Sequence, residues 1–155
     1  MIKKSYEKYL LPKLLDCCCS TKPINYQRQK IIPNACGNIL EIGIGSGLNI
    51  PFYEKSKINN LYGIDPSSEL CDMAKKTAYD NEIEVNLLIN EAEEIELPQD
   101  SIDTVVMTYT LCTIPNPKDA LKVIKRVMKV DAKMLFCEDG SATDKNIFKC
   151  QNRIS

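Results

Sequence analysis

The sequence contains no histidine, carries almost no net charge and has no long apolar run. The absence of histidine excludes Ser-His-Asp and Cys-His catalysis and every metal site that needs an imidazole ligand. The balance of 20 Lys and Arg against 21 Asp and Glu gives a net charge of −1. This balance argues against nucleic-acid partners, because phosphate binding normally needs a basic excess or a basic face. No stretch approaches the roughly 18 consecutive apolar residues that predict a transmembrane helix.

The eight cysteines lack the spacing of a metal site, since no pair forms C-x-x-C and no histidine completes a zinc set. We therefore expect no bound metal. A chain of 155 residues can build a core without disulfide staples, so reduced thiols are expected. Residues 1–4 are basic, but residues 6–9 are polar where a secretory leader would be apolar. No signal peptide is predicted, and we expect a cytoplasmic protein.

The length fits one domain, along which the hydrophobic pattern alternates between strand and helix periods. Strands are predicted at 39–42, 61–64, 84–89, 102–107 and 133–137, and helices at 2–19, 25–32, 67–79 and 118–129. This alternation predicts an α/β fold, a Rossmann-like doubly wound parallel sheet with helices on both faces. We divide the domain into an N-terminal helical cap (1–35), a ligand-binding core (38–139) and a tail (140–155).

A glycine-rich loop, Gly43-Ile44-Gly45-Ser46-Gly47, directly follows the strand predicted at 39–42. Glycine lets the backbone turn sharply and lets a ligand approach without a Cβ in the way. Asp65 ends the next predicted strand, at about the 20-residue distance where a ribose-binding acid is expected. A tight turn alone would also explain the glycines, but this context favours a nucleoside site.

The loop is not typical of a phosphate-bearing nucleotide. In the dinucleotide pattern G-x-G-x-x-G/A counted from Gly43, the last position is Leu48, and no G-K-[ST] of a P-loop follows. Glu41 precedes the loop, and an acidic residue suits an ammonium or sulfonium ligand better than a phosphate. These features favour S-adenosylmethionine (SAM) as the cofactor. An NAD-dependent dehydrogenase is a less favoured alternative.

Four stretches together resemble the class I SAM-dependent methyltransferases. They are residues 40–49, residues 62–67, residues 91–93 with Leu97-Pro98, and residues 103–108 with 111–115. The similarity is to small bacterial enzymes that include phospholipid and quinone methyltransferases and relatives of the alkyl-thiol methyltransferases. It covers nearly the whole chain.

The resemblance implies ten cofactor-binding residues: Glu41, Gly43, Gly45, Gly47, Asn49, Asp65, Pro66, Glu91, Ala92 and Thr108. The first two glycines would line the methionine part of SAM, and Glu41 would lie near its amino group. Asp65 would take the ribose hydroxyls. Pro66 would pack on adenine, and Glu91 or the Ala92 backbone would meet the adenine edge. Thr108 would approach the amino or carboxylate group. The acid run at 91–96 also fits a solvated face, and Thr108 and Thr110 also fit strand-end hydrogen bonding.

The resemblance implies methyl transfer to a small or lipid-like acceptor by in-line displacement. The sequence identifies no catalytic base. Cys112 is expected in the core rather than as a nucleophile. Asp139 stands where relatives often have histidine, which leaves the acceptor chemistry open. The amphipathic segment 2–18 is expected either to cover the site, with a possible peripheral contact to a membrane, or to pack on the sheet.

A second hypothesis is a SAM-binding protein without catalysis. Val130-Asp131-Ala132 replaces the usual Pro-Gly-Gly turn, and Asp139 replaces the usual histidine. The chain also stops before the family's sixth and seventh strands. Without them, residues 134–137 would form an apolar sheet edge, which predicts self-association.

Overall fold

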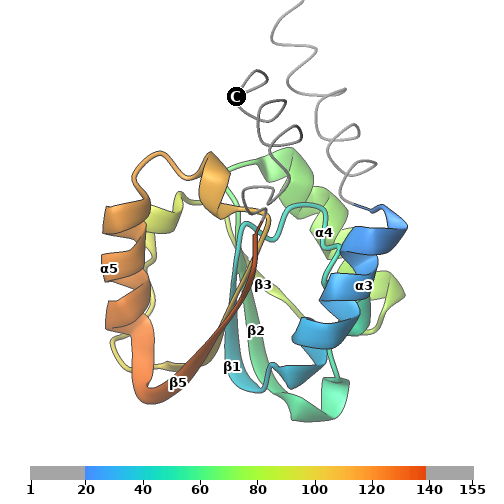
Figure 1. The fold of residues 1–155 in the computed structure, drawn as a ribbon, viewed down its shortest axis with the longest axis horizontal. Coiled ribbons are helices and arrows are strands. Elements are labelled where there is room, and N and C mark those ends of the chain that lie inside the picture. The colour runs from blue at the N-terminus through green and yellow to red at the C-terminus, as the bar shows by residue number, and fades with distance from the viewer. Residues whose placement is uncertain (1–19, 139–155) are drawn as a thin grey trace, which may run out of the picture.

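Five parallel strands form the centre of the computed structural model, which describes residues 20–138 (Figure 1). The strands are β1 (Gly37–Ile42), β2 (Ile58–Ile64), β3 (Asn86–Leu88), β4 (Ile102–Thr108) and β5 (Met128–Cys137). Their order in the sheet is β3-β2-β1-β4-β5, and every neighbouring pair is parallel. The chain builds outward from β1 in both directions, so the topological switch point lies between β1 and β4. The predicted Rossmann-like sheet is confirmed.

In the described part of the chain, three α-helices cover the two faces of this sheet: α3 (Lys22–Ile31), α4 (Ser68–Asp80) and α5 (Pro117–Val127). In Figure 1, α3 and α4 lie on one side of the strands and α5 lies on the other. Each face has its own buried apolar cluster. One joins α4 residues such as Ala74 to Ile39 and Val106, and the other joins α5 residues such as Ile124 to Leu40 and Val105. Residues on both faces of β1 and β4 are therefore buried, as expected for central parallel strands.

Helix α4 begins where its capping residue predicts. The Ser67 Oγ accepts a hydrogen bond from the Leu70 backbone N–H at 3.2 Å, which satisfies one of the free donors of the first turn. Cys71, Ala74 and Ala78 follow at helical spacing and are buried against the sheet. This placement sets the direction in which the chain leaves the end of β2, next to Asp65.

Helix α3 starts earlier than the sequence pattern predicts. The pattern predicts a helix at 25–32, but the helix spans Lys22–Ile31 and Pro23 lies within its first turn. Proline is tolerated there because its missing N–H would have had no partner within the helix. The short 3₁₀ helix η2 (Ile32–Asn34) then leads into β1.

Helix α5 and strand β5 also differ from the predicted pattern. Leu121 of α5 is 41% exposed, although it lies next to the buried Ala120 in the sequence. Strand β5 starts at Met128 rather than Lys133, and residues 130–132 lie within it instead of forming a turn. The pairing with β4 jumps from Ile102↔Met128 to Thr104↔Lys133, so the extra residues bulge out and Val130 is 96% exposed.

Several predictions lie outside the described residues. These are the helix at 2–19, Asp139 and the tail at 140–155, so the division into cap, core and tail stays a prediction. Strand β3 is shorter than the predicted 84–89. Within residues 20–138, no helix combines the length and the apolar character needed to cross a bilayer.

Candidate cofactor site

A pocket of about 180 Å³ opens at the carboxyl ends of β1, β2 and β4. We call it the carboxyl-end pocket. Its lining comes from the segment after β1, the end of β2, the loop after β4 and helices α3 and α4: Arg28, Glu41, Gly43, Ile44, Gly45, Ser46, Leu48, Asn49, Asp65, Leu70, Thr108, Tyr109, Thr110 and Thr113. Six of the ten predicted cofactor-binding residues are among them. The pocket also lies beside the switch point, where parallel α/β sheets bind their ligands.

Backbone geometry at Gly45 keeps one wall of this pocket open. Gly45 has φ +56°, and a Cβ placed on it would have one neighbour within 4 Å, the Gly43 carbonyl oxygen at 4.0 Å. Among residues 20–138, none fills the space beside Gly45, in contrast to Gly43, where a Cβ would lie 2.3 Å from Thr110 Cγ2. A ligand can approach the Gly45 backbone closely, as the sequence pattern predicts.

Asp65 at the end of β2 is tied to the glycine loop. Its Oδ2 accepts a hydrogen bond from the Gly45 backbone N–H at 3.1 Å, and its Oδ1 accepts one from the Ser67 N–H at 2.9 Å. Asp65 is 8% exposed, and burial raises the pKa of its carboxyl while these two N–H groups oppose the shift. Each carboxylate oxygen has a second lone pair, so the group has the capacity to accept ribose hydroxyls as well.

Glu41 is a second carboxylate, buried more deeply than Asp65. It is 1% exposed on β1, where its Oε1 accepts from Asn49 Nδ2 at 2.8 Å and its Oε2 accepts from the Tyr53 hydroxyl at 2.7 Å. Burial raises the pKa of Glu41 to about 7, although both hydrogen bonds and the charge of Arg28 lower it. This carboxyl group therefore titrates near neutral pH.

Arg28 brings a buried positive charge to the same pocket. It is 4% exposed on α3, and its Nε donates to Asn49 Oδ1 at 2.9 Å. Asn49 Nδ2 lies within hydrogen-bond distance of Thr108 Oγ1, at 3.0 Å, as well as of Glu41. The Arg28 guanidinium carbon lies 5.5 Å from the centroid of the Tyr109 ring. The sequence did not point to Arg28, because an arginine on a polar helix is ordinary and only the fold brings it to the sheet.

The loop after β4 is fastened by an acid that the sequence also did not single out. Glu138 Oε1 accepts hydrogen bonds from the backbone N–H groups of Thr110 at 3.0 Å and Leu111 at 3.1 Å. Tyr109 in this loop has φ +56°, a left-handed conformation that is costly for a bulky residue and is often found at functional sites. Cys112 was expected in the core, but it is exposed at the next turn, so that prediction is wrong.

The other four predicted residues lie outside the carboxyl-end pocket. Gly47 faces the protein, since a Cβ on it would come 2.7 Å from Ile50 Cδ1. Ala92 is buried in the cluster on the α5 side, while Pro66 and Glu91 are exposed. Their roles toward a cofactor stay predictions.

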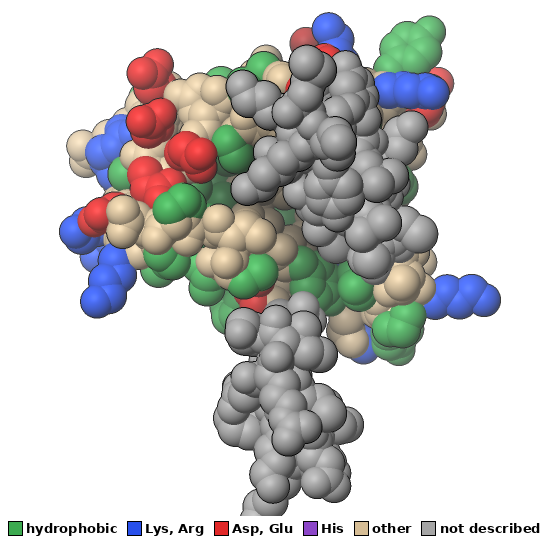
Figure 2. All heavy atoms as spheres, turned by 90° about the horizontal axis from the view of Figure 1, so that it is seen from above, with side chains coloured by type: hydrophobic (Ala, Val, Ile, Leu, Met, Phe, Trp, Pro, Cys, Tyr) green, Lys and Arg blue, Asp and Glu red, His purple; other side chains and the backbone are tan. Residues whose placement is uncertain are grey.

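The residues present suit the charges of SAM. The pocket brings the Asp65 carboxylate, the buried acid Glu41 and the Gly45 backbone around one space, and these groups have the capacity to accept hydroxyls and to face a cation. Among residues 20–138, no three His, Cys, Asp or Glu side chains gather as metal ligands. Figure 2 shows the molecule from above the view of Figure 1, and acidic side chains gather along one side of this surface.

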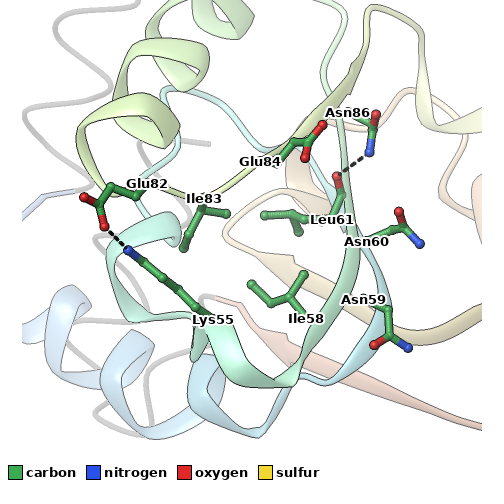
Figure 3. A pocket seen from close by; sticks show the side chains of 9 residues that line it. All are labelled: Lys55, Ile58, Asn59, Asn60, Leu61, Glu82, Ile83, Glu84 and Asn86. Atoms are coloured by element: carbon green, nitrogen blue, oxygen red, sulfur yellow. Dashed lines mark hydrogen bonds and ion pairs between the residues drawn. The ribbon is translucent and has the colours of Figure 1, made fainter.

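A second, larger hollow lies at the opposite ends of the strands. This amino-end hollow has about 320 Å³ and is lined by Lys55, Ile58, Asn59, Asn60, Leu61, Glu82, Ile83, Glu84 and Asn86 (Figure 3). Its charged side chains lie in solvent: Lys55 Nζ meets Glu82 Oε2 at 2.8 Å, with the two side chains 52% and 86% exposed. The side chains of Lys55 and Glu82 are therefore far more exposed than those of Glu41 and Arg28.

Comparison with known proteins finds a match between residues 40–136 and the family described as "Methyltransferase domain". The chain is 30% identical to a phosphatidylethanolamine N-methyltransferase of Cereibacter sphaeroides, over 76% of this chain and 62% of the relative. It is 32% identical to a ubiquinone/menaquinone biosynthesis C-methyltransferase of Rickettsia massiliae, over 69% of this chain and 46% of the relative. Among solved structures, a SAM-dependent methyltransferase of Aquifex aeolicus shares the fold, with a TM-score of 0.62 at 23% identity over 70% of this chain and 59% of that one.

This chain therefore spans roughly half the length of the relatives it matches. The family match nevertheless covers more than half of the chain, from the second half of β1 to the next-to-last residue of β5. The motifs that suggested the resemblance all fall inside that match. The chain belongs to the methyltransferase domain family, the class I SAM-dependent methyltransferases.

Proposed function

We propose that this chain binds SAM in the carboxyl-end pocket and transfers its methyl group to a small or lipid-like acceptor. The observation that carries the proposal is the 3.1 Å hydrogen bond from the Gly45 N–H to Asp65 Oδ2, which joins the glycine loop and the ribose acid in one pocket. Gly43 and Gly45 would lie along the methionine part, Glu41 near the amino group and Asp65 at the ribose. Family membership supports the same assignment.

The chemistry asks little of the protein beyond positioning. SAM supplies a methyl group that its sulfonium already activates, so transfer needs an acceptor lone pair in line with the bond that breaks. The pocket residues hold the donor, and the loop after β4, fixed by Glu138, forms the neighbouring wall. Rigid placement of this kind can supply much of the rate enhancement of a group transfer. We assign no general base.

The proposed acceptor class follows the named relatives, one of which acts on phosphatidylethanolamine and the other in quinone biosynthesis. We propose a cytoplasmic protein, and a lipid-like acceptor would bring it into peripheral contact with a membrane. Vesicle flotation tests this part: the chain should float with phospholipid vesicles and stay behind when vesicles are omitted. A chain that never floats contradicts the membrane contact and leaves the cofactor proposal intact.

We also propose that the chain self-associates through β5. Within residues 20–138 this strand is the last one of the sheet, and Phe136 on it is 65% exposed. An unpaired edge with apolar side chains is a template for pairing with another chain. Sedimentation velocity over a wide concentration range should show a dimer, and a monomer throughout would contradict this proposal.

Two assays on the whole chain test the proposed function. Calorimetry should show binding of S-adenosylhomocysteine (SAH), the product form of the cofactor, and no binding of NAD⁺. Transfer of label from methyl-labelled SAM to phospholipid, quinol, thiol and amine acceptors should then identify the acceptor. Binding without transfer to any acceptor would favour the alternative of a SAM-binding protein without catalysis. Binding of NAD⁺ in place of SAH would contradict the proposal.

A further inference from the structure

Helix α5 concentrates positive charge on the surface of the molecule. It holds four basic residues and a single acid, in a chain whose net charge is −1. Its three buried residues face the sheet, and its charged residues are all exposed. Lys118 and Lys125 lie three residues before and four residues after the exposed Leu121, so the three side chains share one side of the helix. We call Lys118, Leu121 and Lys125 the lysine flank.

The other side of α5 faces the acidic segment at 91–96. Arg126 lies on that side, because its two terminal nitrogens donate to the carbonyl oxygens of Leu97 at 2.9 Å and Ile95 at 2.8 Å. At 3.6 residues per turn, Arg126 lies about 140° around the helix axis from Leu121. The lysine flank therefore points away from the acids of this segment.

The charge of the lysine flank is not neutralised by a neighbouring acid. Asp119 is the acid of α5, and its carboxylate forms an ion pair of 2.8 Å with Lys122. Within residues 20–138, neither Lys118 nor Lys125 has an ion-pair partner. Two exposed cations on this flank are therefore open to an external anion.

Exposed apolar side chains accompany these cations. Leu121 is 41% exposed and Phe136 on β5 is 65% exposed. Phe136 points to the same face of β5 as Met134, which packs against the cluster under α5, because side chains alternate along a strand. As the next-to-last residue of β5, Phe136 also lies at the end of the sheet where the carboxyl-end pocket opens. Figure 2 shows this end of the molecule, with Lys and Arg side chains at the left edge, where α5 lies.

We propose, on the basis of the proposed function, that the lysine flank and Phe136 bind the surface of an anionic phospholipid bilayer and so bring the carboxyl-end pocket to a lipid-like acceptor. The lysine ammonium groups would attract the phosphates of the head groups, while Leu121 and Phe136 enter the boundary between head groups and acyl chains. A nucleic acid would also attract the lysines, but its phosphate backbone offers no apolar layer for these two side chains. The bilayer matches both the charge and the apolar character of this surface.

Co-sedimentation of the wild-type chain with two kinds of vesicle tests the role of charge. The chain should bind vesicles of equal parts phosphatidylcholine and phosphatidylglycerol at least about tenfold more tightly than vesicles of phosphatidylcholine alone, since each lysine near an anionic surface strengthens binding about fivefold. Added salt should release the chain, because it screens exposed charges. Equal binding to the two kinds of vesicle, or binding to neither, would overturn the proposal.

Variants then assign the binding to this surface. The double variant Lys118→Glu with Lys125→Glu should bind the anionic vesicles at least about tenfold more weakly, and Phe136→Ser should bind them at least about threefold more weakly. Lys75→Glu with Lys76→Glu is the matched control, because it makes the same change in charge at two exposed lysines of α4, on the other side of the sheet. This control should weaken vesicle binding less than about threefold. Both double variants should bind SAH with wild-type affinity, which shows that they are folded.

Three results with the variants would overturn the proposal. Equal weakening by the two double variants would mean that overall charge, rather than the lysine flank, controls the binding. Unchanged vesicle binding in Lys118→Glu with Lys125→Glu would place the membrane contact on another part of the chain. If this variant instead lost dimer formation, or the binding of a single-stranded oligonucleotide, while it kept vesicle binding, the lysine flank would belong to a subunit interface or to a nucleic-acid site.

Calorimetry with SAH separates this proposal from the proposed function. A wild-type chain that binds SAH and no vesicles loses the membrane surface but keeps its cofactor site. A wild-type chain that does not bind SAH contradicts the proposed function itself.

Discussion

The carboxyl-end pocket and the amino-end hollow lie at opposite ends of the same parallel strands. The pKa of a glutamate is shifted in opposite directions in these two places. Burial raises the pKa of Glu41 to about 7 in the pocket. At the other end, the ion pair with Lys55 lowers the pKa of Glu82, whose side chain is 86% exposed. Desolvation therefore determines the pKa shift in the carboxyl-end pocket, and ion pairing in solvent determines it in the amino-end hollow.

This difference distinguishes the proposed binding site from a surface depression. The amino-end hollow is the larger of the two, about 320 Å³ against about 180 Å³. Its charges are already satisfied in solvent, so a ligand would gain little from them. The smaller pocket holds charged groups out of water, where interactions with a ligand are stronger. Buried charge and open backbone, rather than volume, mark the site.

The largest expected effect is a pH dependence of stability that Glu41 contributes. Its pKa is raised in the folded state, so the folded chain keeps the proton longer than the unfolded chain as pH rises. The stabilising contribution is complete below pH 4.5 and is lost as pH rises toward 7. At about 1.4 kcal/mol per pKa unit, it amounts to about 3 kcal/mol.

Glu41→Gln should remove this dependence, because glutamine can accept from Asn49 and donate to the Tyr53 hydroxyl without titrating. Urea unfolding at a series of pH values should show the variant gaining about 3 kcal/mol relative to wild type between pH 4.5 and 7. If the free energies of unfolding of the two proteins depended on pH in the same way, burial would not raise the pKa of Glu41 as proposed.

The next effect concerns Asp65. Asp65→Ala should weaken SAH binding about 100-fold, because ribose hydroxyls would lose an ionised acceptor. It also leaves the N–H groups of Gly45 and Ser67 without these hydrogen bonds, so thermal unfolding must be recorded beside calorimetry. Unchanged SAH affinity in a folded variant would show that Asp65 does not bind the ribose.

A smaller effect is expected at Gly45. Comparison with Gly47 separates the effect of filling the pocket from the effect of disturbing the packing of the protein. Gly45→Ala should weaken SAH binding about tenfold and cost about 1 kcal/mol of stability, since the new methyl group enters the pocket at a left-handed φ of +56°. Gly47→Ala is the counterpart, because its Cβ would meet Ile50 and the α4 backbone at Ala74. There we expect the larger loss in the unfolding midpoint. The reverse ranking of the two stability losses would show that the pocket wall is misplaced.

The smallest effect is expected in the amino-end hollow. Glu82→Ala removes an exposed ion pair, and exposed pairs contribute little to stability. Calorimetry and thermal unfolding should both give wild-type values for this variant. A clear loss of SAH affinity would instead connect the amino-end hollow to the cofactor.

Features governed by neighbouring residues were the ones that the sequence predicted. Strand β1 and the glycine loop follow from an apolar run ending at Gly43, and α4 follows from its Ser67 cap and its apolar spacing. The proximity of the loop to Asp65 also follows, because the carboxyl ends of adjacent parallel strands meet at one edge.

Features that depend on distant segments were missed. Arg28 reaches the pocket only because α3 packs beside the sheet, and no local pattern distinguishes it from the other cations of that helix. The early start of β5 arises from pairing with β4 across a bulge, although residues 130–132 have the character of a turn. Cys112 is exposed because the 3₁₀ helix η6 (Leu111–Thr113) turns it away from the core.

Nuclear magnetic resonance of the ¹⁵N-labelled chain titrated with SAH compares the two hollows in a single experiment. The amide signals of Gly43, Gly45, Asp65 and residues 108–110 should shift, together with the side-chain signals of Arg28 and Asn49. The signals of Asn59, Asn60 and Glu82 should stay in place. Shifts centred on the amino-end hollow, or none at either end, would contradict the assignment of the carboxyl-end pocket as the cofactor site.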